Sequence, residues 1–276
     1  MKTYSKLLSI LLILGMAVYA GIAAFAAEDG GAAGQTGSTG QTTNDLVISQ
    51  AVLDRIRAAD PANYDRHVAD YKALLVKLGI HDSIRQEIEK LVLDGYALPE
   101  ILIGCEFLYH SFGTVADLRS FAVQQAAGAS WERLFTEYNR NQPVFKPRSF
   151  PSDYLEKLMS TPGLTADDIM IADRLANATG RPFEEIIEEK LTSPEWRGIT
   201  AKAGILFGGD KLPRVQIKNE QLQAFQSESG LSAARIAEAF VIAHKVGKTA
   251  ETVVGKLKEG YSPEAVFAES YEQKYR

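Results

Sequence analysis

The chain has 276 residues, of which 46% are hydrophobic and 24% charged, and its formal net charge is −5. These proportions are typical of a globular protein with a packed core. The mildly acidic balance, without a long basic block, argues against nucleic acid and anionic membrane surfaces as partners. The only cysteine is Cys105, so an intramolecular disulfide is excluded.

The first 26 residues have the layout of a secretory signal peptide. Lys2 and Lys6 precede an apolar run at 7–18, and small residues follow, with an A-x-A cleavage motif at 24–26. The alternative is an uncleaved membrane anchor, because the charge-free stretch just reaches the roughly 20 residues that cross a bilayer. Both interpretations predict an extracytoplasmic location, and membrane contact is expected only through the N-terminal segment if it is uncleaved.

Residues 27–45 are dominated by Gly, Ser, Thr and Gln and contain no large apolar side chain. Such a segment buries too little surface to offset the entropy of ordering it, so we expect a flexible linker. The ordered part of the chain is therefore expected to begin near residue 46.

Residues 46–94 are expected to form N-terminal helices. Apolar residues at helical spacing predict a short helix before Pro61 and a longer one at about 62–78, which Gly79 ends as a C-cap. Ser83 is the expected cap of a third helix, which stops at Gly95.

A pattern then occurs three times, starting at Gly95, Gly163 and Gly230, about 67 residues apart. Each of these glycines is followed by an isoleucine after six residues, a small residue after nine, a second glycine after 17 or 18, and an aliphatic residue after 23. The corresponding residues are Ile101, Ile169 and Ile236; Gly104, Ala172 and Ala239; Gly113, Gly180 and Gly247; and Leu118, Ile186 and Val253. Recurrence at several matched positions predicts three repeat units, at 95–150 (unit 1), 151–218 (unit 2) and 219–276 (unit 3).

Each unit is expected to be a helix-turn-helix closed by a further short amphipathic segment. The first glycine ends the preceding helix in a left-handed conformation. Thr165 and Ser232 cap the next helix, Thr165 in a capping box with Asp168, and the second glycine ends it. The small residue after nine positions would let a neighbouring helix approach closely. At the positions of Asp167 and Asp168, unit 1 has Pro99-Glu100 and unit 3 has Ala234-Arg235. This pair of acids is therefore not expected to be a shared feature of the units.

Two linkers lie between the units. Residues 139–152 contain three prolines and are expected to be an extended connector. Residues 207–218 contain a Gly-Gly-Asp turn, for which a loop is expected and a small β-hairpin is the alternative. The fold class predicted for the ordered part is therefore all-α, an array of three units packed side by side, each on the next.

No residue cluster predicts a reaction. The four histidines lack metal-ligand spacing, and no nucleophile motif, phosphate loop or pair of converging carboxylates is recognisable. We therefore expect no catalytic residue, no metal site and no cofactor. Cys105 lies in an apolar helical run and is expected to be a buried hydrophobic residue.

Three aromatic residues, Trp131, Trp196 and Tyr261, occupy similar places near the end of each unit. One interpretation is that each packs the closing helix onto its own unit. The other is an aromatic row, a line of exposed rings that could stack on sugars or grip a peptide. These three residues are the candidate binding surface.

The repeat resembles one that is common in exported proteins of Gram-positive bacteria. The resemblance rests on residues 163–169 (GLTADDI) with Gly180 and Trp196, and on residues 230–232 (GLS) with Ile236, Gly247 and residues 258–262 (KEGYS). Unit 1 departs at residues 97–99 (ALP) but fits at 128–131 (GASW). The resemblance covers roughly residues 83–271 and implies a helical-repeat fold and an exported location, but no established activity.

The expected function is that of a non-enzymatic interaction module at the cell envelope, binding a protein or a cell-wall polymer. The first alternative is an envelope enzyme or an enzyme accessory, with a site built from helical carboxylates such as Glu185 or Glu238. The second is a structural or stress-related protein without a small ligand. The sequence specifies no oligomeric state.

Overall fold

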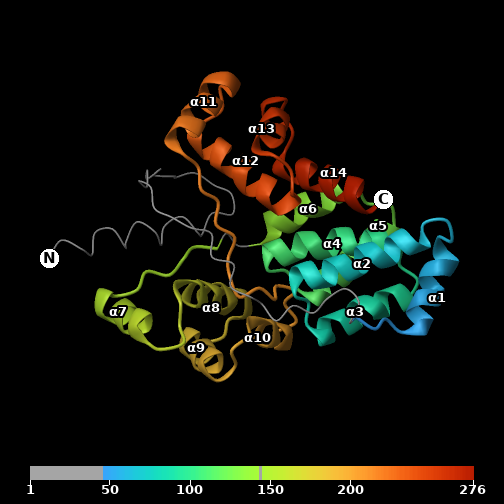
Figure 1. The fold of residues 1–276 in the computed structure, drawn as a ribbon, viewed down its shortest axis with the longest axis horizontal. Coiled ribbons are helices and arrows are strands. Elements are labelled where there is room, and N and C mark those ends of the chain that lie inside the picture. The colour runs from blue at the N-terminus through green and yellow to red at the C-terminus, as the bar shows by residue number, and fades with distance from the viewer. Residues whose placement is uncertain (1–45, 143–144) are drawn as a thin grey trace.

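The computed structural model describes residues 46–142 and 145–276, which form fourteen α-helices and no strand (Figure 1). The predicted all-α fold is confirmed. The predicted signal peptide and linker lie outside the described residues. Within the described residues, no helix combines the length and the apolar character needed to cross a bilayer.

Three helices precede the repeats: α1 (Gln50–Ala59), α2 (Tyr64–Leu78) and α3 (Asp82–Leu93). Unit 1 contains α4 (Leu98–Ser111), α5 (Val115–Ala126) and α6 (Trp131–Asn141). Unit 2 contains α7 (Ser152–Ser160), α8 (Ala166–Thr179), α9 (Phe183–Thr192) and α10 (Trp196–Lys202). Unit 3 contains α11 (Asn219–Ser229), α12 (Ala233–Val246), α13 (Ala250–Lys258) and α14 (Pro263–Tyr275). The helices α4, α8 and α12 each have 14 residues, so the same element follows the first glycine in every unit.

The predicted turn chemistry is found in units 2 and 3. Thr165 and Asp168 form the capping box, with Thr165 N–H 2.8 Å from Asp168 Oδ2 and Asp168 N–H 3.2 Å from Thr165 Oγ1. Gly180 and Gly247 end α8 and α12 in the left-handed conformation. These local signals were predictable because each involves residues only a few positions apart.

Two predicted caps are wrong in their details. At the end of α4 the left-handed residue is Phe112, with φ of 58°, and not Gly113. Glycine is still needed at 113, because a Cβ there would lie 2.5 Å from Leu108 Cδ2. At the start of α3 the cap is His81, whose ring accepts a hydrogen bond from the backbone N–H of Ser83.

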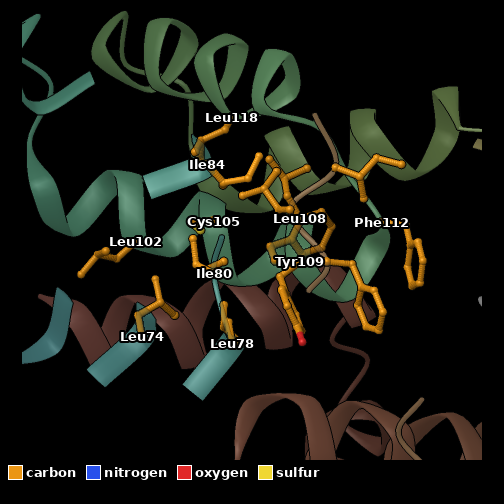
Figure 2. Packing of buried hydrophobic residues seen from close by; sticks show 14 of the residues in the cluster. Leu74, Leu78, Ile80, Ile84, Leu102, Cys105, Leu108, Tyr109, Phe112 and Leu118 are labelled. Carbon is orange, nitrogen blue, oxygen red and sulfur yellow. The ribbon is translucent and has the colours of Figure 1, made fainter. Parts of the chain in front are cut away.

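The core forms one continuous cluster that runs through the N-terminal helices and the repeats. Figure 2 shows Cys105 and Leu108 of α4 among side chains from α2 and α3, including Leu78 and Ile84. Cys105 is fully buried, as predicted, and burial raises the pKa of its thiol. The predicted close approach at the small positions is clearest at Gly104, where a Cβ would lie 3.1 Å from Leu118 and 3.3 Å from Trp131.

The order of the units in space differs from the predicted array. Helix α14 of unit 3 packs on α4 and α6 of unit 1, so unit 3 has its closest helix packing on unit 1 and not on unit 2 (Figure 1). The long non-helical connection after α10 carries the chain from unit 2 to unit 3. It makes no hairpin, so the expected loop at 207–218 is found.

Unit 2 is joined to unit 1 by backbone hydrogen bonds near Gly113. Val115 N–H donates to Gly204 O at 2.8 Å, and Leu206 N–H donates to Gly113 O at 2.9 Å. Phe207 then stacks on Phe112, with 4.3 Å between ring centroids. Unit 1 is therefore the central unit, with unit 2 and unit 3 both attached to it.

Candidate functional site

Trp131 is buried, with 1% of its surface exposed, at the start of α6. Its indole N–H donates a hydrogen bond of 2.8 Å to Oε2 of Glu100, in the first turn of α4. Glu100 also receives two hydrogen bonds from the guanidinium of Arg276, both of 2.9 Å. Trp131 therefore holds the closing helix of unit 1 on the first one, which is the packing interpretation.

Trp196 has the equivalent role in unit 2 and is completely buried. Its indole N–H donates a hydrogen bond of 2.7 Å to Oδ1 of Asp168, and Lys190 Nζ lies 3.3 Å from the same oxygen. Burial opposes ionisation of Asp168, but the hydrogen bonds from Thr165 and Trp196 hold the pKa of its carboxyl below the ordinary value. The acid of the capping box is thus also the anchor of the tryptophan.

Tyr261 differs from both tryptophans, since 43% of its surface is exposed. Its ring lies under Lys256, with Nζ 5.1 Å from the ring centroid. In unit 3 the position of Glu100 and Asp168 is taken by Arg235, which cannot accept a hydrogen bond. The candidate aromatic row of Trp131, Trp196 and Tyr261 is therefore not formed, because two of its three rings are buried.

The two carboxylates considered for an enzyme lie on helices of different units. Glu185 is exposed on α9. Glu238 on α12 pairs with Arg235, and its Oε1 is buried without a hydrogen-bond partner among the described residues. Burial raises the pKa of Glu238. Neither carboxylate lines either of the two clefts described next.

An open cleft of about 410 Å³ lies between the start of α3 and the turn from α9 to α10. Its lining comes from two stretches more than a hundred residues apart. Ile80, His81 and Asp82 form one side, and Thr192, Ser193, Pro194, Glu195, Arg197 and Gly198 form the other. The two sides are brought together where Gly208 meets the left-handed turn at Gly79. A Cβ added at Gly208 would lie 2.7 Å from Gly79 O, so only glycine permits this approach.

The lining of this cleft is mixed, with apolar Ile80 and Pro194 beside polar side chains and charges of both signs. Asp82 and Glu195 supply carboxylates, and Arg197 supplies a guanidinium whose Nε lies 2.6 Å from Glu195 Oε2. His81 is engaged in capping α3, with Nδ1 2.9 Å from Ser83 Oγ. This arrangement offers hydrogen-bond donors and acceptors to a polar ligand. Sequence analysis missed it because no local pattern relates the two stretches.

A second cleft, of about 180 Å³, lies between α5 and α6 and is lined mainly by polar side chains such as Asp117, Gln124 and Glu137. In the part of the chain that the structure describes, no group of three or more His, Cys, Asp or Glu side chains is placed to hold a metal ion.

Of the two clefts, the larger one between α3 and α10 is the candidate binding site, and it is called the α3–α10 cleft below.

Comparison with known proteins finds no matching family model, no matching curated protein and no matching solved structure. The resemblance to the repeat of exported Gram-positive proteins is not tested by these comparisons and stays a prediction.

Proposed function

We propose that the protein is a non-enzymatic, extracytoplasmic helical-repeat protein that binds another protein or a cell-wall polymer through the α3–α10 cleft. The proposal combines the signal-like sequence of residues 1–26 with the character of that cleft. The main support for this proposal is a difference between the side chains at the repeat positions, which are occupied by contacts within the protein, and those of the cleft, which face open space. Trp131, Trp196 and their carboxylate partners are engaged in packing, whereas the cleft is open and carries charged side chains of both signs.

The size and openness of the cleft, and the charges along it, favour an extended polar chain as its occupant. A volume of about 410 Å³ lies within the range of ligand sites, roughly 300–1,000 Å³. Sites for small drug-like ligands are mostly apolar and enclosed. Here the cleft is open, with Asp82, Glu195 and Arg197 along it, which suits the alternating donors and acceptors of a peptide or glycan segment.

Gly198 offers a way to fill the cleft without disturbing the fold. It lies in α10, lines the cleft, and a Cβ added there meets no atom within 4 Å. Gly255 in α13 is a matched control, because it is also helical and also has open space at its Cβ. Replacement of either glycine by tyrosine adds the same side chain at a different place.

The test is cosedimentation of the secreted protein with envelopes isolated from the source cells, with and without prior protease treatment of the envelopes. We expect Gly198→Tyr to weaken binding about tenfold or more and Gly255→Tyr to leave it unchanged. Loss of binding after protease treatment identifies a protein partner, and retained binding identifies a wall polymer. A wild-type protein that stays in the supernatant, or equal binding by both variants, contradicts the proposal.

A further inference from the structure

The smaller of the two clefts, called the α5–α6 cleft below, lies between corresponding faces of two helices. Helix α5 contributes the residues at 117, 120, 121 and 124, and α6 contributes those at 134, 137, 138 and 141. In each helix the later residues follow the first by three, four and seven positions, so all four side chains lie on one face. Gln142, the C-cap residue of α6, completes the lining.

The floor of the α5–α6 cleft is apolar. Phe121 and Leu134 are 4% and 1% exposed, and Tyr138 is half-buried. The rings of Phe121 and Tyr138 pack edge to face, with 5.7 Å between their centroids and 73° between their planes. Because this contact joins α5 to α6, the apolar floor is already formed in the free protein.

The rim of the α5–α6 cleft consists of neutral polar side chains. Ser120, Asn141 and Gln142 are exposed, and Gln124 is half-buried. Nε2 of Gln124 donates a hydrogen bond of 3.1 Å to Ser120 Oγ, which leaves the amide oxygen of Gln124 as an acceptor. The amides of Asn141 and Gln142 each offer donors and an acceptor, and neither side chain has a hydrogen-bond partner among the described residues.

The two carboxylates of the lining already have partners. Oδ2 of Asp117 accepts hydrogen bonds from the backbone N–H and the hydroxyl of Thr114, of 2.8 and 2.7 Å. Oε1 of Glu137 lies 3.3 Å from Nε of Arg133. The residues that line the cleft include no lysine, arginine or histidine. This distribution of charge favours a neutral ligand over an anion or a cation.

An apolar floor inside a rim of neutral donors and acceptors is complementary to a sugar ring. One face of a pyranose is made of C–H groups, which pack on apolar and aromatic side chains, and its hydroxyl groups both donate and accept hydrogen bonds. The volume of about 180 Å³ is below the roughly 300–1,000 Å³ of pockets for larger ligands. It therefore suits a single ring better than an extended chain.

We propose that the α5–α6 cleft binds one neutral sugar ring. The apolar face of the ring lies on Phe121 and Tyr138, and its hydroxyl groups form hydrogen bonds with the amides of Gln124 and Asn141. The sugar is either a free monosaccharide or the end residue of a glycan. The inference uses no residue of the α3–α10 cleft, so its failure leaves the proposed function unaffected.

The first experiment is saturation-transfer NMR of the full-length protein with N-acetylglucosamine and with glucose. We expect transfer to the ring C–H protons of at least one sugar, with a Kd on the order of 1 mM for a ligand of this size. Gln124→Leu removes the amide from the rim and should raise Kd about fivefold or more. Gln125→Leu is the matched control, because Gln125 is the next residue of α5 and does not line the cleft, and it should leave Kd unchanged.

A second variant tests the opposite side of the cleft. Asn141 is exposed in the last turn of α6, so Asn141→Leu should fold normally and should also raise Kd about fivefold. Absence of transfer from both sugars overturns the proposal. Equal Kd values for the wild type, Gln124→Leu and Asn141→Leu overturn it as well, because the sugar would then bind elsewhere.

Two charged sugars test the neutrality of the ligand. Glucuronate carries a negative group and glucosamine a positive one on a similar pyranose ring, and both should bind no more tightly than the neutral sugars. Tighter binding of either charged sugar overturns the assignment of a neutral ligand.

A trisaccharide built from the bound sugar distinguishes the two sources of the ring. Binding of both the trisaccharide and the monosaccharide supports a site for the end residue of a glycan. Binding of the monosaccharide alone supports a site for a free sugar.

Discussion

The indole N–H of Trp196 and Oδ1 of Asp168 are joined by a hydrogen bond of 2.7 Å, and Trp131 and Glu100 repeat this bond at 2.8 Å in unit 1. In both units the acceptor lies five residues after the first glycine, in the first turn of the 14-residue helix. The repeated element is thus a contact between the start of the first helix and the start of the last.

Removal of this bond should destabilise unit 2 measurably. Trp196→Phe retains most of the ring but removes the indole donor from Oδ1 of Asp168, which then keeps only Lys190 Nζ at 3.3 Å, and we expect a cost of about 1.5–3 kcal/mol. Urea unfolding measures the change. Tyr261→Phe is the comparison and should change the stability by less than about 0.5 kcal/mol, because Tyr261 is exposed. Equal values for the two variants would show that the indole bond contributes nothing.

Among the carboxylates of the described residues, Glu106 is the one whose substitution should destabilise the protein most. It is 1% exposed, and its oxygens lie 2.7 Å from Lys77 Nζ, 2.7 Å from Lys274 Nζ and 2.5 Å from the hydroxyl of Tyr275. Glu106→Gln removes the charge that pairs with both lysines, and we expect a loss of about 3 kcal/mol in the free energy of unfolding. The exposed pair of Arg276 with Glu272 provides the control, and Glu272→Gln should cost under about 0.5 kcal/mol.

The carboxyl of Glu106 should also make the stability of the protein depend on pH. Burial opposes ionisation of Glu106, but hydrogen bonds from Lys274 and Lys77 lower its pKa below the ordinary 4.5. A carboxyl whose pKa is lowered on folding stabilises the protein above its unfolded pKa. That contribution is lost as pH falls through the folded pKa. Unfolding curves between pH 7 and pH 3 should therefore show stability falling below about pH 4.5. Glu106→Gln should fall less steeply, and parallel curves for the two proteins would contradict this assignment.

Replacement of two helical glycines by alanine should change the stability of the protein in opposite directions. A Cβ at Gly104 would meet Leu118 at 3.1 Å and Trp131 at 3.3 Å, so Gly104→Ala should destabilise by about 1–3 kcal/mol through overpacking. A Cβ at Gly255 meets nothing within 4 Å, so Gly255→Ala should stabilise by about 0.5–1 kcal/mol. Thermal unfolding of both variants tests the predicted close approach of α4 to its neighbours, and a neutral Gly104→Ala would argue against it.

Features that depend on neighbours in the sequence were predictable, and those that depend on distant residues were not. The capping box at Thr165 and the glycine ends of α8 and α12 follow from short-range geometry. The shared acceptor role of Glu100 and Asp168 was missed, because the two acids are different residue types and only Asp168 belongs to a capping box. Their common partner, a tryptophan about thirty residues later, becomes visible only when the helices are packed.

For the same reason the sequence left two interpretations of Trp131, Trp196 and Tyr261 open, packing onto their own units and an exposed aromatic row. A tryptophan near the start of a short amphipathic helix looks the same in sequence whether its ring faces solvent or the core. In units 1 and 2 a buried carboxylate, Glu100 or Asp168, accepts the indole N–H and holds the ring in the core. In unit 3 the equivalent position is Arg235, which offers no acceptor. The α3–α10 cleft likewise combines side chains from two segments that no periodicity relates.

The ion cluster at Glu106 has a consequence for the order in which the chain can fold. Lys77 comes from the N-terminal helices, whereas Lys274 and Tyr275 lie in α14, 168 and 169 positions after Glu106. The carboxylate of Glu106 on the central helix α4 therefore lacks its full set of partners until α14 has been synthesised. A solenoid can build up stepwise from one end. Here the last helix closes a long loop, so the final native core should form late and in one cooperative step.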